Sequence, residues 1–277
     1  MREYIAFTKK EFKENIRNYK LLSLTILFLV FGIMSPLSAK FMPDLIAHFA
    51  PTLKVTTAPT ALDSWTQFSG NISGLGTSLT LIVFCNILSN EYSKGTLVIM
   101  LTKGLSRSSV VLSKFSIAVI IMTIGFWLSF LCTYGYTMYF WPTANLNHII
   151  FSAFNLWLIS IMYISILILG CVLFRPAFAS VLLVLAATAI LSLISIPKQI
   201  APYTPNFILS KNIDLVSGKV TPPEFIIPII VTIVISIVCL LLAVVLFNKK
   251  QFKDIFIINT NSAVLWENVF SIVEEYI

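Results

Sequence analysis

The chain has 277 residues, of which 57% are hydrophobic and only 11% are charged, and its mean hydropathy is +0.91. A soluble domain carries about 25% charged residues, because its surface must face water. The composition therefore excludes a soluble globular protein and predicts an all-α integral membrane protein. The net charge of +7 is better explained by Lys and Arg on cytoplasmic loops than by nucleic-acid binding, so no nucleic-acid partner is expected.

The first twenty residues predict an amphipathic helix that lies in the membrane interface. At about 100° per residue, one narrow stripe holds Ile5, Phe12, Ile16 and Tyr19. The adjacent face is basic and holds Arg2, Lys9, Lys10, Lys13, Arg17 and Lys20. Such a helix meets acyl chains with its apolar stripe and anionic headgroups with its basic face. The alternative is a solvated charged segment, and a cleavable signal peptide is not expected.

Six apolar segments follow, each near the length of about 20 residues that crosses a bilayer. They cover residues 21–39, 70–89, 109–139, 149–173, 177–196 and 225–247. The third is longer than a bilayer requires and is expected to tilt or to project beyond the membrane. Small residues near the start of the second (Gly70, Gly74 and Gly76) favour close packing between helices.

The distribution of Lys and Arg predicts that both termini are cytoplasmic. With the N-terminus inside, most of the 19 Lys and Arg residues fall on the inner side. The outer loops, 40–69 and 197–224, hold only Lys40, Lys54, Lys198, Lys211 and Lys219. Positive charge marks cytoplasmic segments, so the loop 90–108 is also placed inside. Because loop 197–224 contains apolar residues such as Phe207, it is expected either to dip toward the membrane or to connect two spans plainly.

Three domains result from this pattern: an interfacial helix (1–20), a six-span region (21–247) and a cytoplasmic tail (248–277). The tail shows apolar residues at helical spacing, namely Leu265, Trp266, Val269, Phe270, Val273 and Ile277. Its charges include Glu267, Glu274 and Glu275. Anionic lipid repels an acidic helix, so its apolar face is expected to meet protein, either the N-terminal helix or a partner subunit. The alternative is a frayed tail.

The sequence lacks the common motifs for nucleotide binding and hydrolysis, GxxxxGK[ST], HExxH and GxSxG. Its four cysteines lie in apolar segments without CxxC spacing, which indicates small buried hydrophobes and no metal site. The interiors of the apolar segments lack the charges that ion-coupled transporters usually need. The chain is therefore expected to be non-catalytic and to bind no cofactor. If it transports a substrate, the energy must come from another source.

The most specific motif lies in the polar stretch 90–114, which reads NEYSKGTLVIMLTKGLSRSSVVLSK. Glu91 is followed by GTL at 95–97, then by KGLSR at 103–107, and then by Lys114. This order resembles the permease subunit of an ABC transporter of the type-two export class. That family often shows an acidic residue, GTL, a Pro-Ile/Val-Ser-Arg turn, and Gly-Lys at the start of its third span.

The resemblance covers nearly the whole chain and implies a division of labour. Separate ATPase subunits would bind ATP and Mg²⁺, and a second permease copy or paralogue would complete the substrate path. A short helix from Glu91 to Leu101 would be the coupling helix, and residues 1–20 would be the elbow helix. The resemblance assigns these residues to ATPase coupling: Glu91, Lys94, Gly95, Thr96, Leu97, Leu101, Lys103, Ser106 and Arg107. The membrane-interface residues would be Lys9, Lys10, Phe12, Lys13, Ile16 and Arg17.

The chain departs from the family pattern at Gly104, where Pro is usual, and at Ser113, where Gly is usual. These departures loosen the turn but leave the pair Ser106 and Arg107. The expected function is export of hydrophobic or amphipathic cargo, such as peptides or antibiotics, across a bacterial cytoplasmic membrane. The alternatives act without ATP: a secondary transporter or channel, and a scaffold or immunity protein.

Overall fold

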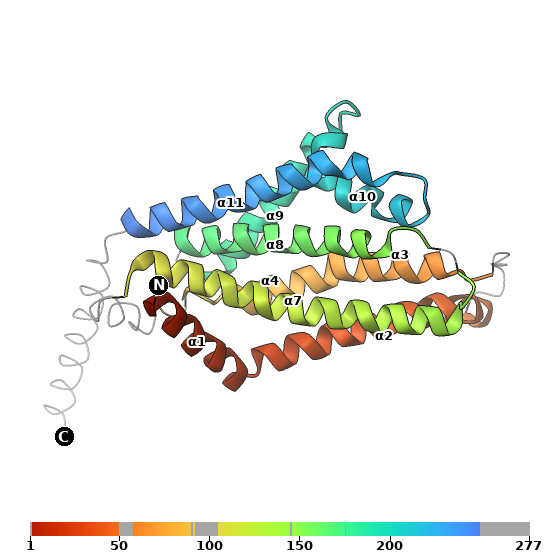
Figure 1. Ribbon diagram of the computed structural model, residues 1–277, viewed down its shortest axis with the longest axis horizontal. Helices are drawn as coiled ribbons and strands as arrows, with labels where there is room; N and C mark the ends of the chain where they lie inside the picture. The colour runs from red at the N-terminus through yellow and green to blue at the C-terminus, as the bar shows by residue number, and fades with distance from the viewer. Residues whose placement is uncertain are drawn as a thin grey trace, which may run out of the picture.

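The computed structural model describes residues 2–49, 58–89, 91, 105–144, 146–174 and 176–249. Within these ranges the regular structure is helical and no strand occurs, which confirms the all-α prediction (Figure 1). Most of the predicted coupling helix and the tail from residue 250 onward lie outside the described residues.

The architecture is a bundle of long helices, accompanied by shorter helices along its length and near its ends (Figure 1). The long helices are α2 (Lys20–Phe49), α7 (Arg107–Phe140), α8 (Ile149–Leu173), α9 (Ala177–Ile194) and α11 (Ile226–Lys249). The shorter ones are α1 (Arg2–Arg17), α3 (Ala61–Asn71), η1 (Ile72–Gly76), α4 (Thr77–Phe84), η2 (Ala201–Tyr203), α10 (Pro205–Val216) and η3 (Pro222–Phe225). Figure 1 shows α1 at the end where α7 begins and α11 finishes, which we call the α1 end, and α10 toward the opposite end.

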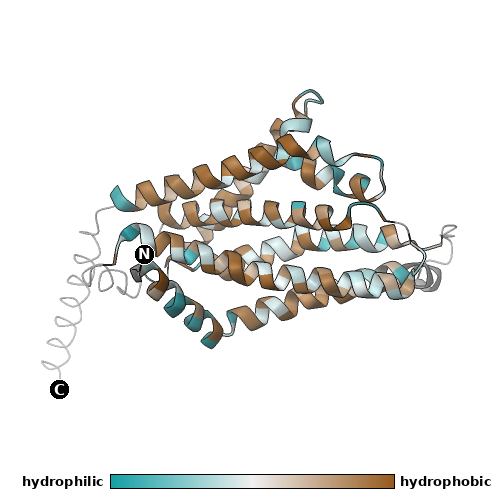
Figure 2. Ribbon diagram, viewed as in Figure 1, coloured by the Kyte–Doolittle hydropathy of each residue, from teal (hydrophilic) through white to brown (hydrophobic). Residues whose placement is uncertain are grey.

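Five helical stretches among the described residues are long and apolar enough to cross a membrane. They are Lys20–Met42, Arg107–Phe140, Ile149–Leu173, Ala177–Ile194 and Pro222–Lys249. Figure 2 shows hydrophobic residues along most of their length, whereas hydrophilic residues gather on α1 and near the helix ends. Five of the six predicted apolar segments therefore coincide with helices of spanning length, and the sixth span and the cytoplasmic position of the termini remain predictions.

The remaining predicted segment, 70–89, which is the second in chain order, overlaps a consecutive run of α3, η1 and α4 that begins earlier, at Ala61. A capping box starts this run, because the Asp63 carboxylate accepts the Thr60 N–H at 2.8 Å and the Thr60 hydroxyl accepts the Asp63 N–H at 3.4 Å. The predicted outer loop 40–69 is thus helical over much of its length, since α2 also continues to Phe49.

The predicted outer loop 197–224 contains a helix that packs on the bundle. α10 begins with a proline at its first turn, where a missing N–H costs nothing. It contacts α8, α11 and α3, and it buries Ile208, Leu215 and Val216. The Asn212 amide donates to the carbonyl of Ser152 at 3.1 Å. This segment is therefore a packed part of the bundle and more than a plain connection.

Close packing joins α2 to α7 and α8 to α9 at two glycines. A Cβ added at Gly32 would lie 2.6 Å from the carbonyl oxygen of Ser129, and one added at Gly170 would lie 2.9 Å from the Cα of Ser180. The hydroxyl of Thr133 also donates to the carbonyl of Gly32 at 2.9 Å. Of the three glycines predicted to pack closely, a Cβ added at Gly76 would lie 3.5 Å from the ring of Phe28 on α2, whereas no atom lies within 4 Å of one added at Gly70 or Gly74.

The long helices differ in how far the rest of the chain covers them. In the most apolar window of α8, 72% of the residues are buried, against 11% in each of the spans Ala177–Ile194 and Pro222–Lys249. α8 is therefore the central helix of the bundle. Apolar faces as open as those of α9 and α11 must meet lipid or another apolar surface.

We expect Gly32→Ala to lower the free energy of unfolding by about 1–3 kcal/mol, because the added methyl forces α2 away from α7. Gly135→Ala is the matched control, since it lies in α7 with open space around it. Thermal unfolding of both variants in one detergent measures the difference. Equal losses for the two variants would contradict the close approach of α2 and α7.

Candidate functional site

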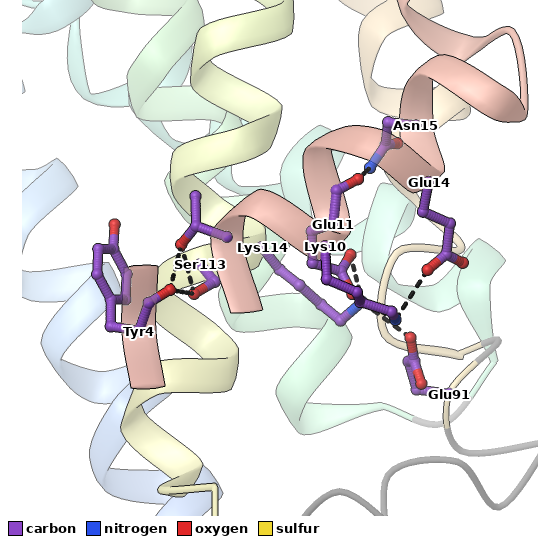
Figure 3. A network of polar contacts seen from close by, with 9 residues as sticks. Tyr4, Lys10, Glu11, Glu14, Asn15, Glu91, Ser113 and Lys114 are labelled. Atoms are coloured by element: carbon purple, nitrogen blue, oxygen red, sulfur yellow. Dashed lines mark hydrogen bonds and ion pairs between the residues drawn. The ribbon is translucent and has the colours of Figure 1, made fainter. Parts of the chain in front are cut away.

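A buried ionic cluster forms at the α1 end, where Lys114 of α7 lies between two carboxylates (Figure 3). The Lys114 ammonium lies 3.1 Å from Glu11 Oε2 and 3.1 Å from Glu91 Oε1. The exposed fractions of the three side chains are 3% for Lys114, 4% for Glu11 and 10% for Glu91. We call these three residues the Lys114 cluster. It joins α1, α7 and the chain that leads into the loop 90–108.

One face of α1 brings Glu11 into the cluster. Residues three and four apart share a helix face, and the face toward α7 holds Tyr4, Phe7, Thr8, Glu11 and Asn15. Tyr4 and Ser116 share a hydroxyl–hydroxyl hydrogen bond of 2.7 Å, and Thr8 donates to the Ser113 hydroxyl at 2.9 Å. Phe7 is buried beneath this face. Helix α1 is therefore fixed to the first turns of α7 by the hydrogen bonds of Tyr4 and Thr8 and by the burial of Phe7.

The opposite surface of α1 carries the residues predicted for the membrane interface. Ile5 and Ile16 are exposed, as are Lys9, Lys13 and Arg17, and Phe12 is half-buried. Ile5 and Ile16 thus face away from the protein, whereas Phe12 packs partly against its core. The contact of this stripe with lipid remains a prediction.

Glu11 has a second ammonium beside it, because Lys10 lies 3.2 Å from Glu11 Oε1 and 2.8 Å from Glu14 Oε2. Partial burial lowers the pKa of Lys10, but the hydrogen bonds and charges of Glu14 and Glu11 outweigh burial and raise it above its ordinary value. Glu11 thus lies in contact with the ammonium groups of both Lys10 and Lys114.

The start of α7 is also tied to the end of α11. Arg107 donates to the carbonyl of Asn248 at 3.0 Å and to that of Phe247 at 3.5 Å. The side-chain amide of Asn248 donates to the hydroxyl of Ser108 at 3.2 Å. Carbonyls at a helix C-terminus lack partners within the helix and carry partial negative charge, which a guanidinium satisfies well.

The comparisons with known proteins bear on the class of this chain. No protein-family model matches it. It is 23% identical over 198 residues to a protein of Bacillus subtilis (strain 168) named "uncharacterized transmembrane protein YxlG", and the match covers 69% of this chain and 76% of that protein. That likeness agrees with the five apolar helices of spanning length. The chain is a multi-pass membrane protein.

Only some of the residues predicted to couple this membrane protein to an ATPase lie in the described part of the chain. Lys94, Gly95, Thr96, Leu97, Leu101 and Lys103 lie outside the described residues. Glu91 faces Lys114 inside the protein, Ser106 accepts the Ser109 N–H at 3.4 Å as the N-cap of α7, and Arg107 bonds the end of α11. The contact of these residues with an ATPase remains a prediction.

Sequence reasoning missed Glu11 and treated Lys114 only as a charge that flanks the motif. One feature of the sequence could have indicated the role of Glu11. It is an acidic residue in a basic helix, and its spacing from Tyr4 and Phe7 places all three on one helix face. Among the described residues, no group of three or more His, Cys, Asp or Glu side chains could hold a metal ion. The contacts of the Lys114 cluster are ion pairs, and they connect α1, α7 and Glu91.

A second feature lies farther along α7, toward its other end. A pocket of about 840 Å³ opens between α7 and the start of α8. Its lining is mainly aromatic and includes Trp127, Phe130, Tyr134, Phe151 and Phe154, together with His148. This volume is in the range of small-molecule sites, and the lining suits an apolar or amphipathic molecule.

We expect Lys114→Met to lower the free energy of unfolding of this membrane protein by about 3–5 kcal/mol, because it leaves buried carboxylates without their shared cation. The matched control is Lys211→Met, which removes a half-exposed ammonium 2.9 Å from Asp214. The control should change stability by less than about 1 kcal/mol. Denaturant unfolding in one detergent measures both, and similar losses would show that the cluster is not a stabilising element.

Proposed function

We propose that this membrane protein is the permease subunit of an ATP-driven ABC exporter of the type-two class. The observation that carries the proposal is the Lys114 cluster. It connects α1, the start of α7 and the residue at which the GTL motif segment begins. An exporter driven by a separate ATPase needs such a connection, because motion at the cytoplasmic loop must reach the spans.

The motif segment, by which we mean residues 91–107, is bonded to the bundle at both ends. This arrangement favours the transmission of a displacement from the segment to the helices. Glu91 at one end pairs with Lys114, and Arg107 at the other end bonds the last carbonyls of α11. In the proposed machine, ATP closes a pair of ATPase subunits against the segment between these residues. The displacement then passes to α7 through Lys114 and to α11 through Arg107.

In this proposal α1 is the elbow helix, and its two faces have different contacts. The face with Glu11 holds α7, whereas the face with Ile5 and Ile16 is open to the acyl chains. Lys9, Lys13 and Arg17 would meet anionic headgroups. The helix thereby anchors the α1 end of the bundle at the cytoplasmic surface of a bacterial membrane.

The proposed cargo is hydrophobic or amphipathic. The pocket between α7 and α8 supports this class, because its aromatic and aliphatic lining suits apolar groups. The open apolar faces of α9 and α11 leave room for a second permease copy or paralogue beside lipid. The chain itself would hold no nucleotide, and ATP and Mg²⁺ would bind to the partner ATPase.

Affinity purification from membranes in mild detergent tests the proposal. The unmodified chain and Leu97→Met should retain a P-loop ATPase in stoichiometric amount, whereas Leu97→Asp should lose at least about nine-tenths of it, because a buried apolar contact becomes charged. Leu97 is a better position than Glu91, whose side chain is buried against Lys114.

Two results would go against the proposal in different ways. Intact complexes without any ATPase would remove the exporter function and favour a protein that acts without ATP. An ATPase that stays bound to Leu97→Asp would keep the exporter function but place the contact on another segment.

A further inference from the structure

One wall of the pocket between α7 and α8 follows a single face of α7. Trp127, Phe130 and Tyr134 line it at spacings of three and four residues, which place them on one side of a helix. Their rings also contact one another. The centroids of Trp127 and Phe130 are 5.4 Å apart, and those of Phe130 and Tyr134 are 6.3 Å apart. The wall is therefore a continuous aromatic surface about two helical turns long.

The wall that α8 contributes is supported by a segment that was predicted to be a loop. Phe151 of α8 lies 6.2 Å from the buried ring of Phe225 between centroids, and Phe225 lies 5.4 Å from Phe207 of α10. The backbone N–H of Asn147 also donates to the carbonyl of Val216 at 3.1 Å. The start of α8 is thus held by neighbouring elements. A pocket that is formed in advance lowers the ordering cost of binding.

His148 gives the pocket a polar end at the start of α8. Its backbone occupies the left-handed region with a φ of 48°, which is uncommon for a residue other than glycine. It is the N-cap of α8, but its side chain makes no capping hydrogen bond. The exposed imidazole is therefore available to exchange a hydrogen bond with a ligand.

The aromatic residues at the end of α7 indicate how deep the pocket lies in the membrane. Tyr136 and Tyr139 are exposed there, and Trp141 follows the helix. Tyr and Trp gather at the level of the lipid headgroups. Figure 1 shows that α8 begins toward the end of the bundle where α7 finishes, so His148 lies near this level. Trp127 lies about three helical turns deeper along α7 than Tyr139.

The open side of the pocket is bordered by apolar residues on two spanning helices. Leu131 of α7 is 60% exposed, and Ile150 of α8 is 70% exposed. Exposed apolar side chains on helices of this kind meet acyl chains. The pocket is therefore open toward the bilayer, and a molecule dissolved in the membrane can reach it from the side.

We infer that this pocket binds a single-chain amphiphile from the bilayer, with its acyl chain along the α7 wall and its polar head hydrogen-bonded to His148. A volume of about 840 Å³ is within the range for a drug-sized ligand, which favours one acyl chain over the two of a phospholipid. The role of this molecule as cargo rests on the proposed function, whereas its binding requires no ATPase.

The probe for this site is lysophosphatidylcholine brominated in its acyl chain, because bromine quenches tryptophan emission on contact. The protein is placed in phosphatidylcholine vesicles without an ATPase, and Trp127→Phe identifies the share of the emission that comes from Trp127. We expect the quenching of Trp127 to saturate as the probe is added. In the control, Leu185→Trp is added to the Trp127→Phe chain. This exposed position on α9 should show quenching in proportion to the probe.

Two substitutions examine the two ends of the bound molecule. Phe154→Ala should weaken binding about tenfold, because it removes one ring of the α8 wall. Phe178→Ala is its matched control, since this ring is exposed on α9 outside the pocket. His148→Leu should weaken binding about fivefold through the lost hydrogen bond. His148→Gln should bind within twofold of the unmodified chain, because its amide also exchanges hydrogen bonds.

Three results would overturn the inference: quenching of Trp127 that rises in proportion to the probe, saturation of Trp127 by a brominated two-chain phosphatidylcholine at the same mole fraction, or unchanged binding in His148→Leu. Thermal unfolding identifies a variant that fails to fold, and Phe154→Leu then replaces Phe154→Ala. Failure to find an ATPase partner would leave these results unchanged, so the two proposals can fail separately.

Discussion

The burial of the Lys114 ammonium is the constraint on which the α1 end of the structure depends. A charge that is 3% exposed must be neutralised by neighbours within contact distance. Its two carboxylates come from positions far apart in the sequence, Glu11 on α1 and Glu91 before the motif segment. One side chain of α7 therefore links α1 to Glu91, in addition to the contacts that Tyr4, Phe7 and Thr8 make.

Helix α7 extends this connection through the molecule. It has 34 residues and is about 50 Å long at the rise of an α-helix. Lys114 lies near its start, whereas Ser129, which contacts Gly32 of α2, and the pocket residues Trp127 and Phe130 lie together in its second half. Because α2 packs against α7 without room for a methyl group at Gly32, the pair should move as one body. In the proposed exporter, a displacement of α7 at the Lys114 cluster would therefore reach the pocket residues that α7 carries.

The long apolar helices could be predicted from hydropathy, because lipid requires an uninterrupted apolar segment of fixed length. The segment predicted at 149–173 is helix Ile149–Leu173, and the one at 109–139 is Arg107–Phe140. The start of α3 was missed because it is set by the local capping box at Thr60. Helix α10 was not predicted because the Pro residues of this segment are typical of loops. The role of Glu11 was not predicted because its partner, Lys114, is brought beside it only by tertiary packing.

The most direct test measures whether ATP reaches the spans through the Lys114 cluster. Spin labels at Lys9 on α1 and at Phe178 on α9, both exposed, would report their distance by pulsed EPR, with the permease bound to its ATPase. We expect trapped ATP to change this distance in the otherwise unmodified chain, and to change it less in Glu91→Gln, which removes one ion pair of the cluster. If ATP leaves the distance unchanged, or changes it equally in both chains, the Lys114 cluster does not carry motion into the spans.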